Sequence, residues 1–318
     1  MIANKQKIFM TLKKYNLLIL ILFFMVIATI LSPRFFTLLN FMNLLQQSAI
    51  TGIVAIGMTF VILTGGIDLS VGSILALAGM TSSIFAKQFG FPVIIAMLIT
   101  ILIGIIVGML TGLIITKFDV PDFIGTLAMM VSIRGLALLL TNGKPIFGLS
   151  SSFRYIGAGF IFKVIPVSGI IWIILTIIAF IVLKFTSTGR AFYAIGGNSY
   201  SAYLSGIKTE KVKTKAYMIS GGLAAFSGIM LAAWLSTGQP SAGNGMELDA
   251  IASSVIGGAS LTGGVGGVIG TFGGVFLLTI ITNILNLIGV PSYFQQIIKG
   301  IIILVAVIGN NMLSLRKK

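Results

Sequence analysis

Residues 93–115 read VIIAMLITILIGIIVGMLTGLII, without one charged side chain. A bilayer core about 30 Å thick needs about 20 apolar residues in helical form, so this stretch is long enough to span it. Residues 15–31 and 170–183 repeat the pattern. The sequence therefore predicts an all-α, polytopic membrane protein embedded in a lipid bilayer.

The composition of the whole chain supports this class. Of 318 residues, 57% are hydrophobic and 8% are charged, whereas soluble domains carry about 25% charged residues. The net charge of +15 would suggest a nucleic-acid partner in a soluble protein. Here basic side chains are expected in cytoplasmic loops, and no basic patch is interleaved with aromatic residues, so we expect no nucleic-acid binding.

Several chemistries are excluded by what the sequence lacks. There is no cysteine and no histidine, which removes thiol nucleophiles, thiolate or imidazole metal sites and the usual proton shuttle. No Gly-x-x-x-x-Gly-Lys-Ser/Thr phosphate loop occurs, so the chain is not expected to bind or hydrolyse ATP. We expect neither an enzyme nor a chain that binds a cofactor or metal.

Breaks at glycine, proline and charge clusters divide the chain into about ten transmembrane helices within one transmembrane domain, residues 1–318. The first apolar run is long and lacks a small-x-small cleavage site, so it is interpreted as a retained helix. The predicted helices are 15–31, 46–64, 70–86, 92–115, 122–140, 168–184, 216–236, 247–261, 265–288 and 294–312.

The distribution of basic residues predicts the orientation. With the N-terminus inside, fourteen Lys and Arg fall on the cytoplasmic side and five outside, as the positive-inside rule requires. If segment 247–261 did not cross, the ratio would fall to eleven against eight. Both termini are therefore predicted to be cytoplasmic, with an outer loop at about 141–167 and a cytoplasmic loop at about 185–215. The fourteen are Lys5, Lys7, Lys13, Lys14, Lys117, Lys184, Arg190, Lys208, Lys211, Lys213, Lys215, Arg316, Lys317 and Lys318; the five are Arg34, Lys87, Lys144, Arg154 and Lys163.

Residues 64–73, TGGIDLSVGS, place a carboxylate between two apolar segments. Asp68 and Ser70 could bond the unpaired amides that open the next helix. Alternatively Asp68 is a hinge or gate residue, because ionisable groups at membrane depth are costly and often functional. Residues 257–262, GGASLT, are similar to residues 65–70. Either an internal repeat or convergence of two glycine-rich segments explains this similarity.

Residues 237–249, TGQPSAGNGMELD, are polar and open a short helix with Glu247 and Asp249 in its first turn. Such acids complement the helix dipole. The other interpretation gives Gln239, Asn244 and the two acids a role at an outer mouth, guiding a polyhydroxylated solute or docking a binding protein.

Other polar residues interrupt apolar segments. Asn283 and Asn286 share one helix face, as do Gln295 and Lys299. They could line a solute pathway or join helices by hydrogen bonds. Arg134 belongs to the same class of candidates.

The basic loop 185–215 carries Arg190 and then GGNSYSAYLSGI at 196–207. Asn198 or Ser199 is predicted to cap a short helix that Gly206 ends. This pattern indicates a cytoplasmic docking element, the alternative being an ordinary charged loop.

Three motifs follow one another along the chain. They are residues 65–73, the segment from Gly197-Asn198 to Ser205-Gly206-Ile207, and the run from ELDAIA at 247–252 to Gly270. Together they resemble the bacterial permeases of ATP-binding-cassette (ABC) importers for ribose, galactose, xylose, arabinose and the furanosyl signal autoinducer-2. The resemblance extends from about residue 32 to 307. Residues 45–47, 141–145, 239–243 and 286–290 look most like the ribose permeases.

This resemblance implies a permease that carries a monosaccharide, ribose before its siblings, into the cytoplasm. It implies a homodimer in the bacterial inner membrane, a cytoplasmic ATPase with two fused nucleotide-binding domains that holds ATP and Mg²⁺, and an extracytoplasmic sugar-binding protein. An ion-coupled secondary transporter is the alternative that Asp68, Arg134 and Lys299 keep open.

The candidate residues form three groups. The pathway or gate group is Asp68, Ser70, Gln46, Gln47, Asn283, Asn286 and Gln295. The outer-mouth group is Asn142, Gln239, Asn244, Glu247 and Asp249, and the ATPase-coupling group is Arg190, Gly197, Asn198, Ser199, Ala202, Ser205 and Gly206.

Overall fold

The apolar runs form helices throughout residues 16–315, the part of the chain that this computed structural model describes. Thirteen α-helices, one π-helical turn and two small two-stranded sheets occur there, so the mostly helical class is confirmed. The basic residues predicted at the two cytoplasmic ends, 5–14 and 316–318, lie outside the described residues. The elements are α2 (Asn16–Leu31), α3 (Leu38–Leu63), α4 (Val71–Ser83), η1 (Ile84–Gln88), α5 (Val93–Lys117), α6 (Asp122–Leu139), β1 (Ile146–Phe147), α7 (Ser151–Ala158), β2 (Phe160–Ile161), β3 (Ile165–Pro166), α8 (Val167–Phe185), α9 (Ser187–Gly197), α10 (Ser199–Leu204), α11 (Thr209–Leu235), β4 (Thr237–Gly238), α12 (Met246–Ile256), α13 (Val268–Leu287) and α14 (Ser292–Leu315).

Six helices of the described chain, α3, α5, α6, α8, α11 and α13, are long and apolar enough to cross a membrane. Two of them begin well before the predicted bounds. Helix α3 begins at Leu38 rather than at 46, with Thr37 accepting a cap bond from Asn40, and α11 begins at Thr209 rather than at 216. Asn40 and Asn43 interrupt the apolar run at the start of α3, and charged residues between 210 and 215 do so in α11, which hid these starts from a search for apolar runs.

The predicted helix 247–261 is wrong in its extent. Helix α12 has 11 residues, about 16 Å at 1.5 Å per residue, which is too short to cross a bilayer alone. It ends at Ile256 because Gly258 turns the backbone to φ 92°, and the Gly258 and Ala259 N–H groups close the helix by bonding to Val255 O and Ser254 O. Gly257 packs against the backbone of Gly270.

An extended segment precedes α12 and runs beside α4. Gly238 lies against Ser83 and Gly79 near the end of α4, whereas Gly243 lies against Gly72 and Leu75 near its beginning. Backbone outside a helix is tolerated at membrane depth only where protein or a cavity covers it. Helix α4 provides that cover, because all 13 of its residues are buried.

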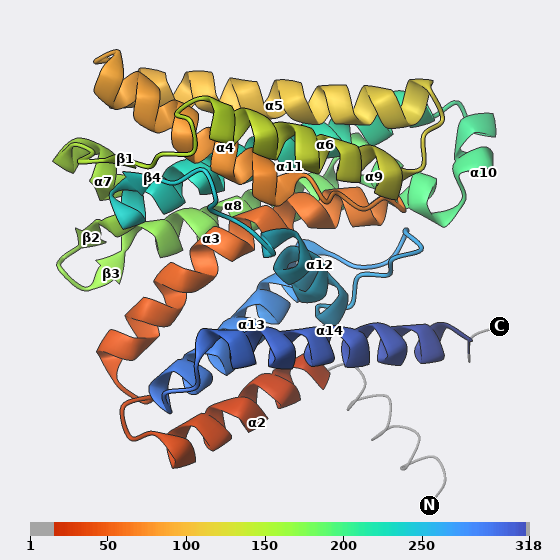
Figure 1. Ribbon diagram of the computed structural model, residues 1–318. Helices are drawn as coiled ribbons and strands as arrows, with labels where there is room; N and C mark the ends of the chain where they lie inside the picture. Colours follow the sequence, from red (N-terminus) through yellow and green to blue (C-terminus); the bar gives the residue numbers. More distant parts are fainter. Residues whose placement is uncertain (1–15, 316–318) are drawn as a thin grey trace, which may run out of the picture.

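The helices form two layers around α3, which runs diagonally through both (Figure 1). Helices α4, α5, α6, α8, α9 and α11 make up the upper layer, and α2, α13 and α14 the lower one. Helices α5 and α11 pack so closely that only glycine fits at two positions of α5. A Cβ on Gly104 would lie 2.6 Å from Gly221 O, and one on Gly108 would overlap Tyr217 O. Small residues thus allow the two helix backbones to approach each other closely.

Short sheets order the loops at one end of the bundle. Strand β1 pairs antiparallel with β4, Ile146 opposite Gly238, and β2 pairs with β3. The loop 141–167, which also contains α7, therefore lies beside the start of segment 237–249. These two segments were predicted to share the outer side.

Candidate functional site

Asp68 lies fully buried between α3 and α4. Its Oδ1 accepts hydrogen bonds from the Ser70 backbone N–H at 3.0 Å and from Ser70 Oγ at 2.6 Å. Its Oδ2 accepts one from Ser220 Oγ of α11 at 2.7 Å. The capping arrangement is therefore present, and the same carboxylate also ties this loop to α11.

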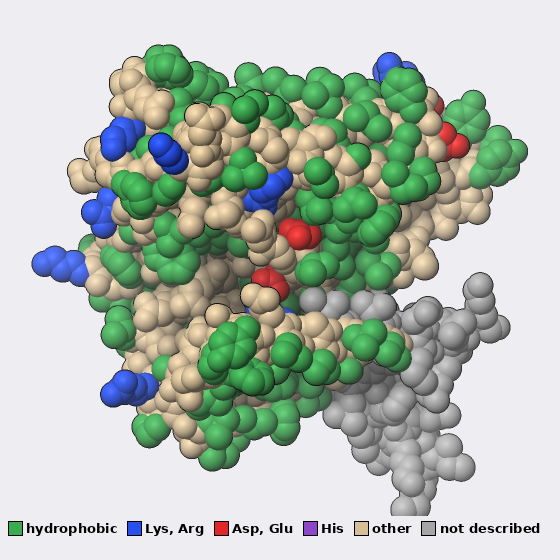
Figure 2. Space-filling view, in the orientation of Figure 1, with side chains coloured by type: hydrophobic (Ala, Val, Ile, Leu, Met, Phe, Trp, Pro, Cys, Tyr) green, Lys and Arg blue, Asp and Glu red, His purple; other side chains and the backbone are tan. Residues whose placement is uncertain are grey.

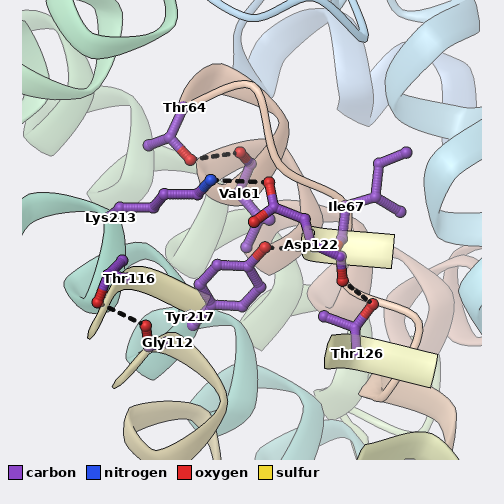
Figure 3. Close-up of polar contacts among 9 residues, drawn as sticks. All are labelled: Val61, Thr64, Ile67, Gly112, Thr116, Asp122, Thr126, Lys213 and Tyr217. Carbon is purple, nitrogen blue, oxygen red and sulfur yellow. Dashed lines mark hydrogen bonds and ion pairs between the residues drawn. The ribbon is translucent and has the colours of Figure 1, made fainter. Parts of the chain in front are cut away.

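Further contacts hold the loop 64–70 against α11 (Figure 3). The Tyr217 hydroxyl donates to Ile67 O at 3.3 Å. Beside it, Lys213 Nζ of α11 pairs with Asp122 Oδ2 of α6 at 2.8 Å. Sequence reasoning missed Asp122 as a partner. Its position directly after Pro121, in the first turn of α6, is the signal that could have identified it.

The two echoing glycine loops meet at the end of α9. The Gly264 N–H donates to Leu63 O at 3.0 Å. A Cβ on Gly196 would overlap both Leu63 O and Gly264 N, and a Cβ on Gly263 would lie 2.8 Å from Gly196 Cα and from Gly65 N. We call this backbone-on-backbone contact the glycine junction; its residues are Leu63, Gly65, Gly196, Gly263 and Gly264.

Tyr193 of α9 reinforces the junction, because its hydroxyl donates to Gly266 O at 2.9 Å. Burial raises the pKa of this phenol above its ordinary value, so the hydroxyl remains a donor near neutral pH.

Helices α9 and α10 occupy the predicted coupling loop. Asn198 Oδ1 accepts from the Ser201 N–H at 2.8 Å, and Gly206 follows the helix at φ 84° with Ile207 N–H bonded to Ala202 O. The predicted cap and end of this short helix are confirmed. Helix α9 was not predicted as a separate element.

The coupling candidates differ in their surroundings. Apart from its own helix and chain neighbours, no heavy atom within residues 16–315 would lie within 4 Å of a Cβ on Gly197, although the Gly197 backbone itself lies against Gly264. A side chain is therefore excluded at Gly196 and has room at Gly197. Ala202 is buried, whereas Arg190, Ser199 and Ser205 are exposed. Sequence reasoning overlooked the exposed apolar face of α10, which is formed by Tyr200, Tyr203 and Leu204, 72%, 65% and 68% exposed.

Arg134 of α6 joins the extended segment to α4. Its Nη1 donates to Pro240 O at 2.8 Å and to Ala242 O at 2.7 Å, and its Nη2 donates to Gly72 O at 3.2 Å. The Glu247 carboxylate also lies beside Gly72 of α4: its Oε2 is 2.5 Å from the position that a Cβ on Gly72 would occupy. This arrangement fixes where α12 begins.

A cavity of about 100 Å³ opens where α3, α12, α13 and α14 meet. Asp249 Oδ2 of α12 and Lys299 Nζ of α14 form an ion pair across it at 2.9 Å. In Figure 2, acidic side chains are visible in the hollow between the upper layer and α14. We call this the polar cavity; its lining is Gln47, Thr51, Asp249, Val275, Leu278, Thr279, Thr282 and Lys299.

Most other pathway candidates form hydrogen bonds between elements. Gln46 Nε2 donates to Gly157 O of α7 at 2.9 Å, and Asn283 exchanges two hydrogen bonds with Asn40. Gln295 Nε2 donates to Asn286 Oδ1 at 2.8 Å, which joins the end of α13 to α14. These bonds correspond to the interhelical alternative.

The outer-mouth candidates do not lie together. Asn142, Gln239 and Asn244 are exposed, and Asn142 and Gln239 lie near the β1–β4 pair. Glu247 and Asp249 lie deeper, beside Arg134 and Lys299 respectively. Of the predicted residues, the polar cavity therefore brings together Gln47, Asp249 and Lys299.

The chain is similar to known transport permeases over most of its length. Residues 40–307 match a family described as the permease component of branched-chain amino acid transport systems. The chain is 49% identical to the ribose import permease protein of Bacillus subtilis (strain 168), covering 89% of this chain and 88% of that protein. It is 43% identical to the ribose import permease protein of Escherichia coli (strain K12), covering 92% of each chain. A xylose transport system permease protein of the same strain is 34% identical, covering 94% of this chain and 93% of that protein. No solved structure matches the chain significantly.

Proposed function

Because this chain belongs to that transport-system permease family, we propose that it is the membrane-spanning permease subunit of an ABC importer that carries ribose into the bacterial cytoplasm. The observation that carries the proposal is the 49% and 43% identity to two ribose import permeases over almost the whole chain. Another sugar of the same class is the second candidate. The 34% identity to a xylose permease favours xylose in that role.

We propose ten crossings within a single inner-membrane domain, with both termini cytoplasmic. The β1–β4 pair lies at one end of α4 and the glycine junction at the other, and segment 238–264 connects these ends. The eighth crossing would thus be an extended segment, the short α12 and a glycine loop. Loop 141–167 would then be extracytoplasmic and loop 185–215 cytoplasmic.

The partners proposed are a second copy of the permease, a cytoplasmic ATPase with two fused nucleotide-binding domains, and an extracytoplasmic sugar-binding protein. ATP and Mg²⁺ would reside on the ATPase, and we expect no cofactor or enzymatic activity in this chain. The exposed Tyr200, Tyr203 and Leu204 of α10 form a face suited to the ATPase, because aromatic anchors dominate protein interfaces. Asn142, Gln239 and Asn244 are exposed and available to the binding protein.

The mechanism proposed is alternating access. When the ATPase closes on ATP it would displace α10 and the adjoining α9. The glycine junction would pass this movement to loops 64–70 and 257–267, because backbone atoms in direct contact cannot absorb it by rotating side chains. Loop 64–70 follows α3 and loop 257–267 joins α12 to α13, so helices that line the polar cavity would move.

Reconstitution of the permease with its ATPase and binding protein in proteoliposomes tests the proposal. Labelled ribose should enter only when ATP and the binding protein are both present. A thermal-shift series on the binding protein with ribose, galactose, xylose, arabinose and autoinducer-2 identifies the sugar. Stabilisation by xylose and not by ribose would favour the second candidate, and uptake by the purified chain alone under an ion gradient would contradict an ABC mechanism.

A further inference from the structure

The polar cavity gathers hydrogen-bonding side chains from helices that are far apart in the sequence. Helix α3 meets α12, α13 and α14 there, and each contributes at least one polar group. The polar side chains are Gln47, Thr51, Asp249, Thr279, Thr282 and Lys299.

The Asp249–Lys299 ion pair of the polar cavity is partly exposed. Asp249 and Lys299 keep 25% and 30% of their side chains exposed, although they lie on helices that we assign to the membrane. Charged groups at membrane depth are costly in contact with lipid and are found facing protein or a water-filled space. The hollow above this pair is therefore expected to hold water or a polar solute rather than lipid chains.

The lining offers both donors and acceptors. Lysine donates up to three hydrogen bonds, a carboxylate accepts them, and the Gln47 amide does both. Thr279 and Thr282 donate their hydroxyl protons to Val275 O and Leu278 O of their own helix, so toward the cavity they are acceptors. Val275 and Leu278 add apolar wall. A sugar presents the matching set of hydroxyl groups and apolar C–H surface.

The lining is also electrically balanced, because one carboxylate faces one ammonium group at 2.9 Å. A balanced pair can bond several hydroxyls of a neutral solute without favouring an anion or a cation. This distinguishes the cavity from a phosphate site, which would present unpaired basic groups.

We infer that the polar cavity is where the translocated solute, a neutral monosaccharide, contacts this chain, with the Asp249–Lys299 pair as its polar centre. The inference rests on the proposed function and adds the site. Gln47 contacts the solute, whereas Gln46, one position earlier on α3, is turned toward α7 and bonded to Gly157.

A cysteine-labelling experiment tests the lining directly, because the natural chain contains no cysteine. In the reconstituted complex, Gln47→Cys is treated with a membrane-impermeant cationic methanethiosulfonate, and Gln46→Cys is the neighbouring control. We expect Gln47→Cys to react at least about tenfold faster, and its labelling to reduce ribose uptake about tenfold, because the label fills a cavity that must admit solute. Equal labelling rates, or uptake unchanged after complete labelling at position 47, would overturn the inference.

Charge variants separate a solute site from a structural tether between α12 and α14. Asp249→Asn and Lys299→Gln should each lower ribose uptake about tenfold or more, because each leaves one charge unpaired. The exchanged double variant Asp249→Lys with Lys299→Asp restores the pair but reverses its donors and acceptors, and its uptake should stay low. Restoration of uptake to the level of the unaltered complex would show a tether and overturn the inference.

The unaltered complex provides the remaining comparison. If it imports none of the sugars tested, the proposed function fails. If it imports ribose and the Gln47→Cys complex still does so after labelling, only the site assignment fails.

Discussion

At the glycine junction, backbone lies directly on backbone: Gly264 bonds to Leu63, and Gly196 leaves no room for a Cβ. At the polar cavity, side chains from four helices surround open space, and Asp249 and Lys299 form an ion pair there. Backbone atoms in direct contact leave no side chain that could rotate away, whereas the cavity lining includes Gln47 and Lys299, which can change rotamer. Under the proposed mechanism, movement would pass through contacts between glycine backbones, and solute would pass between polar side chains.

Gly196→Val should have the largest effect and would break the junction. Its side chain would overlap the backbone at Leu63 and Gly264, and overpacking of this kind costs about 3 kcal/mol when backbone must move. We expect lower thermal stability in detergent and loss of ribose uptake. Gly135→Val in α6 is the matched control, since no heavy atom of the described chain outside its own helix and chain neighbours would lie within 4 Å of its Cβ. Equal losses in both variants would contradict the junction.

Asp68→Ala removes the acceptor of three hydrogen bonds and should lower the free energy of unfolding by about 2 kcal/mol. Because Asp68 links the junction loop to α4 and α11, ATP hydrolysis should become less coupled to uptake. Thermal melts and the ratio of ATP hydrolysed to ribose imported measure this. Ser220→Ala removes one of those bonds and should show a smaller change, so a larger effect from Ser220→Ala would argue against this account.

Arg134→Lys should lower the free energy of unfolding by about 1–2 kcal/mol, because a lysine lacks the planar guanidinium group that donates to three carbonyl oxygens here. The extended segment would then position α12, and with it Asp249, less firmly. We expect reduced ribose uptake while ATP hydrolysis stimulated by the loaded binding protein persists. Arg154→Lys, at an exposed position of α7, is the control and should leave both rates unchanged.

Asn198→Ala should have the smallest effect. It should lower the free energy of unfolding by about 1 kcal/mol, since it removes only the N-terminal cap of α10. Uptake should fall modestly, and Asn198→Ser should restore it because serine also caps helices. An alanine variant with full coupling would show that the shape of α10 is not needed to engage the ATPase.

The cap at Asn198 and the turn at Gly206 were predictable because both depend on residues that are adjacent in sequence. The helical class was predictable for a related reason, since long apolar runs must satisfy their backbone hydrogen bonds within the segment. The 247–261 segment was predicted too long although its end has a local signal, the left-handed turn at Gly258. That an extended segment precedes α12 was not predictable, because it depends on the cover that α4 provides. Gln46 and Gln47 look equivalent in sequence, and only the packing of α3 gives one to α7 and the other to the cavity.

The sequence by itself determined that this protein is a helical, multi-spanning membrane protein, because hydrophobicity, loop charge and local turn chemistry act over short distances along the chain; its membership of the permease family rests on its similarity to known proteins. Only the tertiary structure decided which glycines touch and which polar groups meet. Those contacts join α3 to the end of α9 and α12 to α14, and their energies depend on distances between atoms that the order of residues does not specify.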